Sequence, residues 1–177
     1  MYSKNNKSNT PRLRVHVDSS VPGLVDLYQT AAEKHNNKLK VCGMGDQCGL
    51  FPDVGFSLFV PYTTTFSKGC SDQSDYLLNF HVKTELIASV YSGSGSVFNR
   101  NMAFLLYPRY NMNKMPLYLA NQFAVLADEY DGYLMGIFSC LSHRPFEVEA
   151  GIRLVEICLP SRIPFQVELV VDNSVGY

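Results

Sequence analysis

The sequence lacks several features that would place it in a functional class at once. It contains no tryptophan, and its 15 Lys and Arg residues against 16 Asp and Glu give a formal charge of −1. No long stretch is strongly basic, which argues against general binding of nucleic acid. No apolar stretch approaches the roughly 18 residues of a membrane-spanning helix, and no basic segment followed by an apolar run follows Met1. We expect an intracellular protein that is neither secreted nor held in a membrane.

The cysteines and histidines form no metal-binding pattern. Five cysteines are odd in number and lack paired C-x-x-C spacings, so reduced thiols are expected. Four scattered histidines never stand four residues apart, the spacing that places two imidazoles on one helix face. The sequence therefore predicts no protein-ligated zinc site. The residues concerned are Cys42, Cys48, Cys70, Cys140, Cys158, His16, His35, His81 and His143.

The chain has the size and composition of one globular domain. It has 177 residues, of which 46% are hydrophobic and 18% are charged. Residues 1–14 carry Lys and Arg among Asn and Ser and are predicted to be a polar arm. One short helix is expected at about 23–35, where Leu24, Leu27, Tyr28 and Ala31 recur at helical spacing. Residues 15–171 would form the folded unit and residues 172–177 a short tail.

Short β-type segments separated by Gly, Ser, Asn, Asp and Pro fill the rest of the chain. Their spacing is typical of a barrel or jelly roll. The repeated Ser-Gly segment at residues 92–96 predicts a flexible hairpin loop, because no helix signal follows it for phosphate binding. The strongest predicted strands are Phe56–Pro61, Tyr76–Ile87, Ala103–Tyr107, Leu134–Leu141, Arg153–Leu159 and Phe165–Val171.

Four short motifs carry the most information about function. Residues 53–58 read DVGFSL, residues 107–114 read YPRYNMNK, residues 127–132 read ADEYDG, and residues 151–156 read GIRLVE. In order and spacing they resemble the motifs D-A-G-x-D-L, P-R-S-S-x-x-x-K, G-x-I-D-x-x-Y-x-G and G-x-R-x-x-Q of the trimeric dUTPase family. The sequence is therefore identified as a divergent member of that family, and a viral origin is plausible by the same resemblance.

The resemblance implies a fold and an assembly. Members of the family are distorted jelly-roll β-barrels, three subunits form a ring, and each active site takes residues from neighbouring subunits. The chain is accordingly expected to be all-β, with one short helix near its N-terminus, and to form a homotrimer. The family cleaves dUTP to dUMP and pyrophosphate: Mg²⁺ holds the phosphates and a carboxylate activates the attacking water.

Several positions keep the residue type that nucleotide binding requires. By resemblance, the Arg109 guanidinium would contact phosphate, Asn121 would recognise uracil, and the Tyr130 ring would pack on deoxyribose. Gly132 stands at a turn position that the family also keeps. The candidates for nucleotide binding are Arg109, Asn121, Tyr130, Gly132, Arg153 and Glu156.

The residues that perform the chemistry are replaced. The general-base aspartate of the third motif aligns with Ala127, and the aspartate of the first motif aligns with Ser57. Loss of a positioned base typically lowers the rate by about 10²–10⁴-fold. Glu156 and Asp131 bring negative charge to positions where the family has glutamine and often arginine. Residues 172–177 contain neither arginine nor the glycine-rich lid with which the family covers the triphosphate.

The leading interpretation is therefore a dUTPase-like scaffold for structure or interaction that does not hydrolyse dUTP and needs no cofactor. Two alternatives remain open: a working dUTP diphosphatase that uses Mg²⁺ at a rebuilt acidic site, and a protein that binds dUMP or a related deoxynucleotide without cleaving it. A protein partner is expected alongside self-association, in the cytoplasm or nucleus of a host cell if the protein is viral. The residues that could rebuild the site are Asp53, Asp128, Glu129, Asp131 and Glu156.

Overall fold

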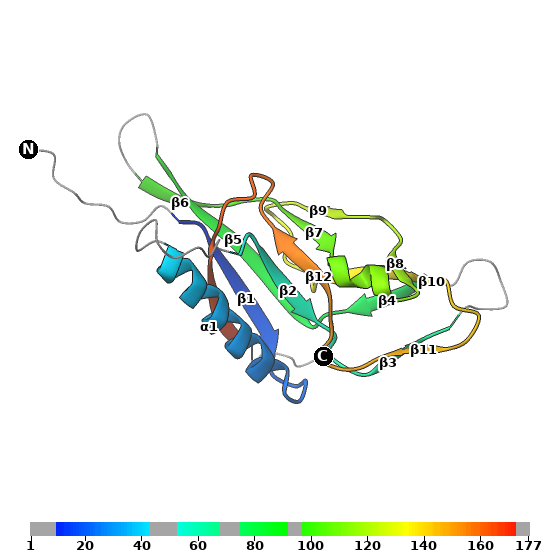
Figure 1. Ribbon diagram of the computed structural model, residues 1–177. Coiled ribbons are helices and arrows are strands. Elements are labelled where there is room, and N and C mark those ends of the chain that lie inside the picture. Colours follow the sequence, from blue (N-terminus) through cyan, green and yellow to red (C-terminus); the bar gives the residue numbers. More distant parts are fainter. Residues whose placement is uncertain (1–9, 43–52, 68–74, 92–96, 173–177) are drawn as a thin grey trace, which may run out of the picture.

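The computed structural model describes residues 10–42, 53–67, 75–91 and 97–172 (Figure 1). These residues form mainly β-strands, with one α-helix, α1 (Leu24–Cys42), and one short 3₁₀ helix, η1 (Tyr110–Lys114). The strands are β1 (Arg12–Asp18), β2 (Gly55–Phe59), β3 (Thr64–Phe66), β4 (Asp75–Asn79), β5 (Val82–Tyr91), β6 (Val97–Asn101), β7 (Phe104–Pro108), β8 (Leu117–Leu119), β9 (Ala124–Leu126), β10 (Met135–Cys140), β11 (Phe146–Val148), β12 (Arg153–Cys158) and β13 (Gln166–Asp172).

The strands pair into four sheets within the described part of the chain. The two largest have the orders β13-β1-β5-β6 and β2-β12-β7-β9, and the smaller ones are β4-β10-β8 and β11-β3. The expectation of a mainly β fold is confirmed, but the pairing does not close into a barrel. One reason lies in the segment expected as a single strand, Tyr76–Ile87. It breaks at His81, which has a φ of 54°, so that β4 and β5 enter different sheets.

The first strand begins inside the segment expected to be a polar arm. Strand β1 pairs in parallel with β13 and antiparallel with β5. Leu13, Val15 and Val17 are fully buried and alternate with Arg14 and His16, which is the period of a strand with one face in the core. Residues 12–14 therefore belong to the sheet, which corrects the expected boundary, and residues 1–9 lie outside the described residues.

Helix α1 is longer than the sequence pattern indicates, because it ends at Cys42 rather than near His35. Asn36 and Asn37 were expected to end the helix but lie within it. The Asn36 side chain bonds to β13. It donates to the Val167 carbonyl at 2.8 Å and accepts from the Val167 amide at 2.9 Å. The helix lies along β1 and β13 in Figure 1 and thereby forms one wall of the site described below.

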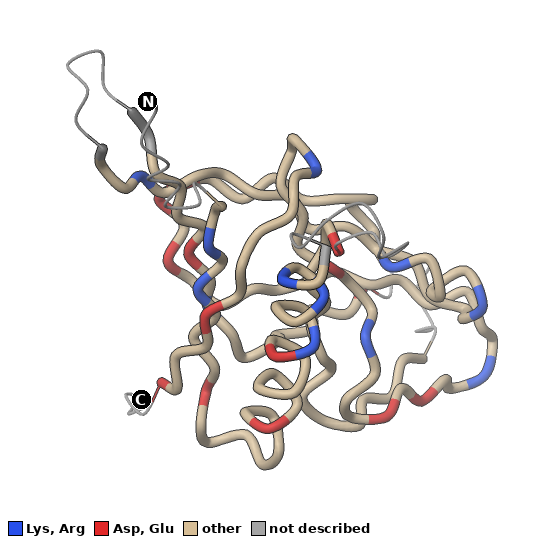
Figure 2. Tube along the Cα trace, turned by 60° about the vertical axis from the view of Figure 1, so that its left-hand side comes forward, with Lys and Arg blue, Asp and Glu red and all other residues tan. Residues whose placement is uncertain are grey.

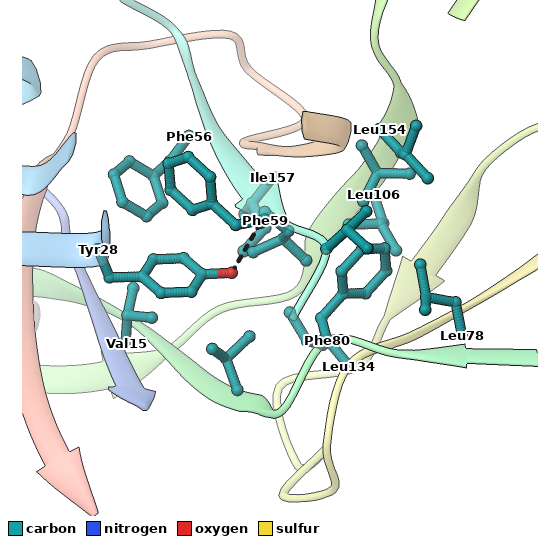
Figure 3. Close-up of a cluster of buried hydrophobic side chains, with 14 of the residues drawn as sticks. Val15, Tyr28, Phe56, Phe59, Leu78, Phe80, Leu106, Leu134, Leu154 and Ile157 are labelled. Carbon is teal, nitrogen blue, oxygen red and sulfur yellow. Dashed lines mark hydrogen bonds between the residues drawn. The ribbon is translucent and has the colours of Figure 1, made fainter. Parts of the chain in front are cut away.

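Tyr28 anchors α1 to the core (Figure 3). The Phe59 amide donates to its hydroxyl at 3.0 Å, and the Phe59 ring meets the Tyr28 ring edge-on with centroids 4.9 Å apart. Phe56 lies against the same ring. Because Phe56 and Phe59 belong to β2, one buried side chain positions the helix against the strand that carries the first motif.

The expectations for thiols and metals are tested only in part. Cys140 and Cys158 are free and buried, whereas Cys48 and Cys70 lie outside the described residues, as does the predicted loop at residues 92–96. Among the residues that the structure describes, no three His, Cys, Asp or Glu side chains are grouped so that they could hold a metal ion.

No helix in the described ranges is both long and apolar enough to span a membrane.

Candidate functional site

Three of the four motifs meet at a cavity of about 320 Å³ between α1 and strands β2 and β12. Strand β2 contributes Ser57, β12 contributes Arg153 and Glu156, and the turn after β7 contributes Arg109. We call it the basic cavity, because four cationic side chains line it with two carboxylates. These charged residues are Lys34, Lys38, Arg109, Arg153, Asp53 and Glu156.

Arg109 is tied to other side chains of its own chain. Its backbone amide donates to the Leu154 carbonyl at 2.8 Å, which fixes the turn between β7 and η1. Its Nη1 donates to Ser57 Oγ and lies 3.3 Å from Glu156 Oε2. Strand register explains this meeting, because Glu156 stands opposite Ser57 in β2 and opposite Tyr107 in β7. The Glu156 carboxylate therefore takes the contact that an anionic ligand would make with this guanidinium.

Gly55 leaves space that the side chains of Glu156 and Cys158 occupy. A Cβ atom at residue 55 would lie 3.0 Å from Cys158 Sγ and 3.1 Å from Glu156 Cδ. Burial, with a further contribution from the nearby Glu156 carboxylate, raises the pKa of Cys158 to about 11. The thiol is thus protonated near neutral pH and packs as a small apolar group, which makes it a poor nucleophile.

Helix α1 supplies residues to this cavity that the sequence interpretation missed. Lys34, His35 and Lys38 line it from one helix face, and the Lys38 ammonium lies 2.9 Å from Asp53 Oδ2. Figure 2 shows the lysines gathered on the C-terminal half of the helix. Lys34 and His35 stand four and three residues before Lys38, and this spacing could have indicated that the three side chains share one helix face. The sequence pattern does not indicate which strand that face packs against.

His35 gives stability a pH dependence. The side chain is 5% exposed, its Nε2 lies 2.9 Å from the Phe165 carbonyl oxygen, and burial lowers its pKa below the ordinary value. The unfolded chain then binds more protons than the folded one as the pH falls below about 6.5. We expect the free energy of unfolding to fall from about pH 7.5 to about pH 5.5, by no more than about 1.4 kcal/mol per pH unit for this group.

Urea unfolding at the two pH values measures this loss, and His35→Gln is the matched variant. The variant keeps a donor for the Phe165 carbonyl but does not titrate, so its pH dependence should be smaller than that of the wild type. Equal pH dependence in both proteins would contradict a role for His35.

The third motif lies at a second cavity, of about 350 Å³. Tyr130 lines this second cavity, and its hydroxyl donates to the Tyr133 carbonyl at 2.6 Å. Gly132 packs so closely on Tyr130 that a Cβ there would lie 2.9 Å from the hydroxyl oxygen. We call this the acidic cavity. Its charged residues are Lys83, Glu85, Asp128, Glu129, Asp131 and Asp172.

The residues predicted for the site divide between the two cavities of one chain. Arg109, Arg153, Glu156 and Ser57 share the basic cavity, whereas Tyr130 lines the acidic one. The other three candidates, Ala127, Asn121 and Gly132, line neither of the two.

The five carboxylates considered for a rebuilt metal site are also divided between the two cavities. Asp53 and Glu156 line the basic cavity, and Asp128, Glu129 and Asp131 line the acidic one. Within one chain, neither of these two cavities contains all five carboxylates. Charge alone could not reveal this division, because it depends on which strands pair.

The chain is similar to known proteins in its three-dimensional structure. No family model matches the sequence, and no curated protein matches it. Among solved structures, the chain is similar to the dUTPase from Streptococcus mutans, with 21% identity over 73% of this chain and 88% of that one, at a TM-score of 0.45. It is also similar to the EIAV dUTPase, with 17% identity over 60% of this chain and 73% of that one, at a TM-score of 0.42. Superpositions at these scores assign no role to individual residues.

Proposed function

We propose that the chain is a dUTPase-like protein that does not hydrolyse dUTP and that serves as a structural or interaction scaffold. The observation that carries this proposal is the contact of Arg109 with both Ser57 and Glu156. The guanidinium that would bind phosphate already has a carboxylate partner, and the position of the general base is held by Ala127. A methyl side chain neither accepts a proton nor orients water.

Self-association belongs to the same proposal. The motif residues are divided between two cavities of one chain, and a site that contained all of them would need residues from more than one copy. The homotrimer that the family resemblance implies would supply such an arrangement. Its closed cyclic symmetry would use one pair of complementary surfaces three times.

A second candidate function is binding of dUMP or a related deoxynucleotide without cleavage. It is favoured by Lys34 and Arg153, two cations of the basic cavity with no ion-pair partner among the described residues. A working dUTP diphosphatase has less support. Mg²⁺ prefers carboxylate oxygens, which would have to come from Asp53 and Glu156 at this cavity, and both already pair with cations.

The test is pyrophosphate release from dUTP in the presence of Mg²⁺, with Arg109→Ala as the background. We expect the wild type to release no more pyrophosphate than this variant, because Ala127 stands where the family resemblance places the general base. Binding of dUMP measured by calorimetry then separates the scaffold from the non-cleaving binder. Release that disappears in Arg109→Ala would refute the proposal and identify a rebuilt active site.

Ala127→Asp tests whether the missing base is the only defect. We expect this variant to remain inactive, because the Glu156 carboxylate still contacts the Arg109 guanidinium. Ser57 also still stands in place of the aspartate of the first motif. Turnover in the single variant would show that the rest of the site is intact.

A further inference from the structure

Two cations of the basic cavity are not neutralised by the chain itself. The ion pairs described above neutralise Lys38 and Arg109. Lys34 lies on α1 and Arg153 on β12, and neither has an ion-pair partner among the described residues. Both residues are exposed. The cavity therefore has two unpaired positive charges on different walls, which attract a ligand that carries separate negative groups.

Strand β2 adds a backbone donor to the same cavity. It is an edge strand of the sheet β2-β12-β7-β9 and pairs on one side only, with β12. On its other side, the Phe59 amide donates to the Tyr28 hydroxyl of α1. Residues two apart along a strand direct their backbone groups to the same side, so the Ser57 amide also faces α1. Because Ser57 lines the cavity, this N–H group is placed to bind an anionic oxygen there.

An apolar surface continues from the cavity across the same sheet. Strand register places Glu156 of β12 opposite Tyr107 of β7, and the centroids of the Tyr107 and Phe123 rings are 5.8 Å apart. Val125 of β9 stands opposite Leu105, which shares a face of β7 with Tyr107. Phe123 is 47% exposed and Val125 is 64% exposed. We call Tyr107, Phe123 and Val125 the apolar patch.

The width of the sheet sets the spacing between the cavity and the apolar patch. Strands β2, β12, β7 and β9 lie next to one another in this order (Figure 1). Neighbouring strands are about 4.8 Å apart, so roughly 14 Å separates β2 from β9. An extended polypeptide covers this distance in about four residues, at about 3.3 Å per residue.

We propose that the basic cavity and the apolar patch together bind an acidic segment of a partner protein. Two neighbouring carboxylates of the segment bind Lys34 and Arg153, and an apolar side chain about four residues away packs on the apolar patch. Exposed apolar side chains next to polar groups are typical of surfaces that bind proteins. This inference rests on the interaction role proposed above and names the chemistry of the partner.

The probe is the acetylated and amidated hexapeptide Glu-Glu-Gly-Ser-Gly-Phe, in which phenylalanine follows the second glutamate by four residues. The control Gln-Gln-Gly-Ser-Gly-Phe lacks the charges, and the control Glu-Glu-Gly-Ser-Gly-Ala lacks the ring. Titration of the full chain, followed by NMR or calorimetry, should show binding of the probe and at least about tenfold weaker binding of each control. Added salt should weaken binding of the probe. No binding of the probe, or equal affinity for the probe and either control, would overturn the proposal.

Four variants at exposed residues locate the surface. Lys34→Gln and Arg153→Gln should each weaken binding of the probe by about three- to tenfold. Arg144→Gln removes an exposed positive charge between β10 and β11 and should leave binding unchanged. Val125→Thr keeps the side-chain shape and should weaken binding of the probe but not of the alanine control. Melting temperatures should stay close to that of the wild type, since all four residues are exposed. Unchanged affinity in Lys34→Gln and Arg153→Gln would contradict the assignment.

Two other occupants of this surface are distinct outcomes of the same experiments. Binding of dUMP without binding of the probe would assign the cavity to a nucleotide, and the proposal would be wrong. If neither binds and Lys34→Gln lowers the mass measured by light scattering, a second copy covers the surface, which also overturns the proposal. Pyrophosphate release from dUTP tests the proposed function separately. Failure of the probe to bind, without such release, refutes this inference alone.

Discussion

Replacing Glu156 with glutamine should raise the affinity of the basic cavity for a phosphate-bearing ligand by at least about tenfold. The change removes a negative charge 3.3 Å from Arg109 while the side chain keeps its shape. A carboxylate about 4 Å from a phosphate oxygen is repelled by about 4 kcal/mol at an effective dielectric constant of 20. The Glu156 side chain is 33% exposed, so screening by solvent reduces that figure.

Calorimetric titration with pyrophosphate and with dUMP measures the change. Glu147→Gln is the control for loss of one negative charge elsewhere. The double variant of Glu156→Gln with Arg109→Gln should not show the increase in affinity. An unchanged affinity in Glu156→Gln would show that Glu156 is not what keeps anions from Arg109. The position of the general base is still held by Ala127, so we expect tighter binding of the ligand without hydrolysis.

Replacing Tyr28 with alanine should lower the free energy of unfolding by about 3–5 kcal/mol. The ring is completely buried between α1 and β2, and its hydroxyl accepts the Phe59 amide. Tyr28→Phe keeps the ring and leaves only that amide without its partner, so a smaller loss of about 1–3 kcal/mol is expected. Unfolding in urea, followed by circular dichroism, measures both.

Gln29→Ala is the matched control on the same helix. Gln29 is exposed, and within the described residues its side chain bonds to Glu33, at 2.7 Å, so its loss should change the free energy of unfolding by less than about 0.5 kcal/mol. Similar losses for Tyr28→Phe and Tyr28→Ala would mean that the hydrogen bond, and not the packing of the ring, holds α1 on the sheet.

The basic cavity was predictable in part. Arg109, Arg153 and Glu156 could be chosen from short motifs, because each motif pairs a chemically distinctive residue with glycine or proline at fixed spacing. The contact between Arg109 and Glu156 was not predictable, since it depends on β7 and β2 pairing on either side of β12. The contribution of Lys38 required knowing where the last turns of α1 lie.

Local pattern also failed where a tertiary contact overrode it. Asn36 reads as a helix end, yet its bonds to Val167 allow α1 to continue. Arg12 and Arg14 read as part of a polar arm, yet they lie on the outward face of β1, where Arg14 pairs with Glu85 and Glu168. In both cases the deciding partner lies more than 70 residues away in the sequence.

By itself, the sequence predicted strands such as Ala103–Tyr107 and Arg153–Leu159 and the start of the helix, because these properties are local to residue type and spacing. The tertiary structure decided how the motif residues are grouped. Strand pairing brings Ser57, Arg109 and Glu156 to one cavity and places Tyr130 and Asp131 at another. Partners distant in sequence are chosen by the burial of side chains along whole strands, which short motifs do not record.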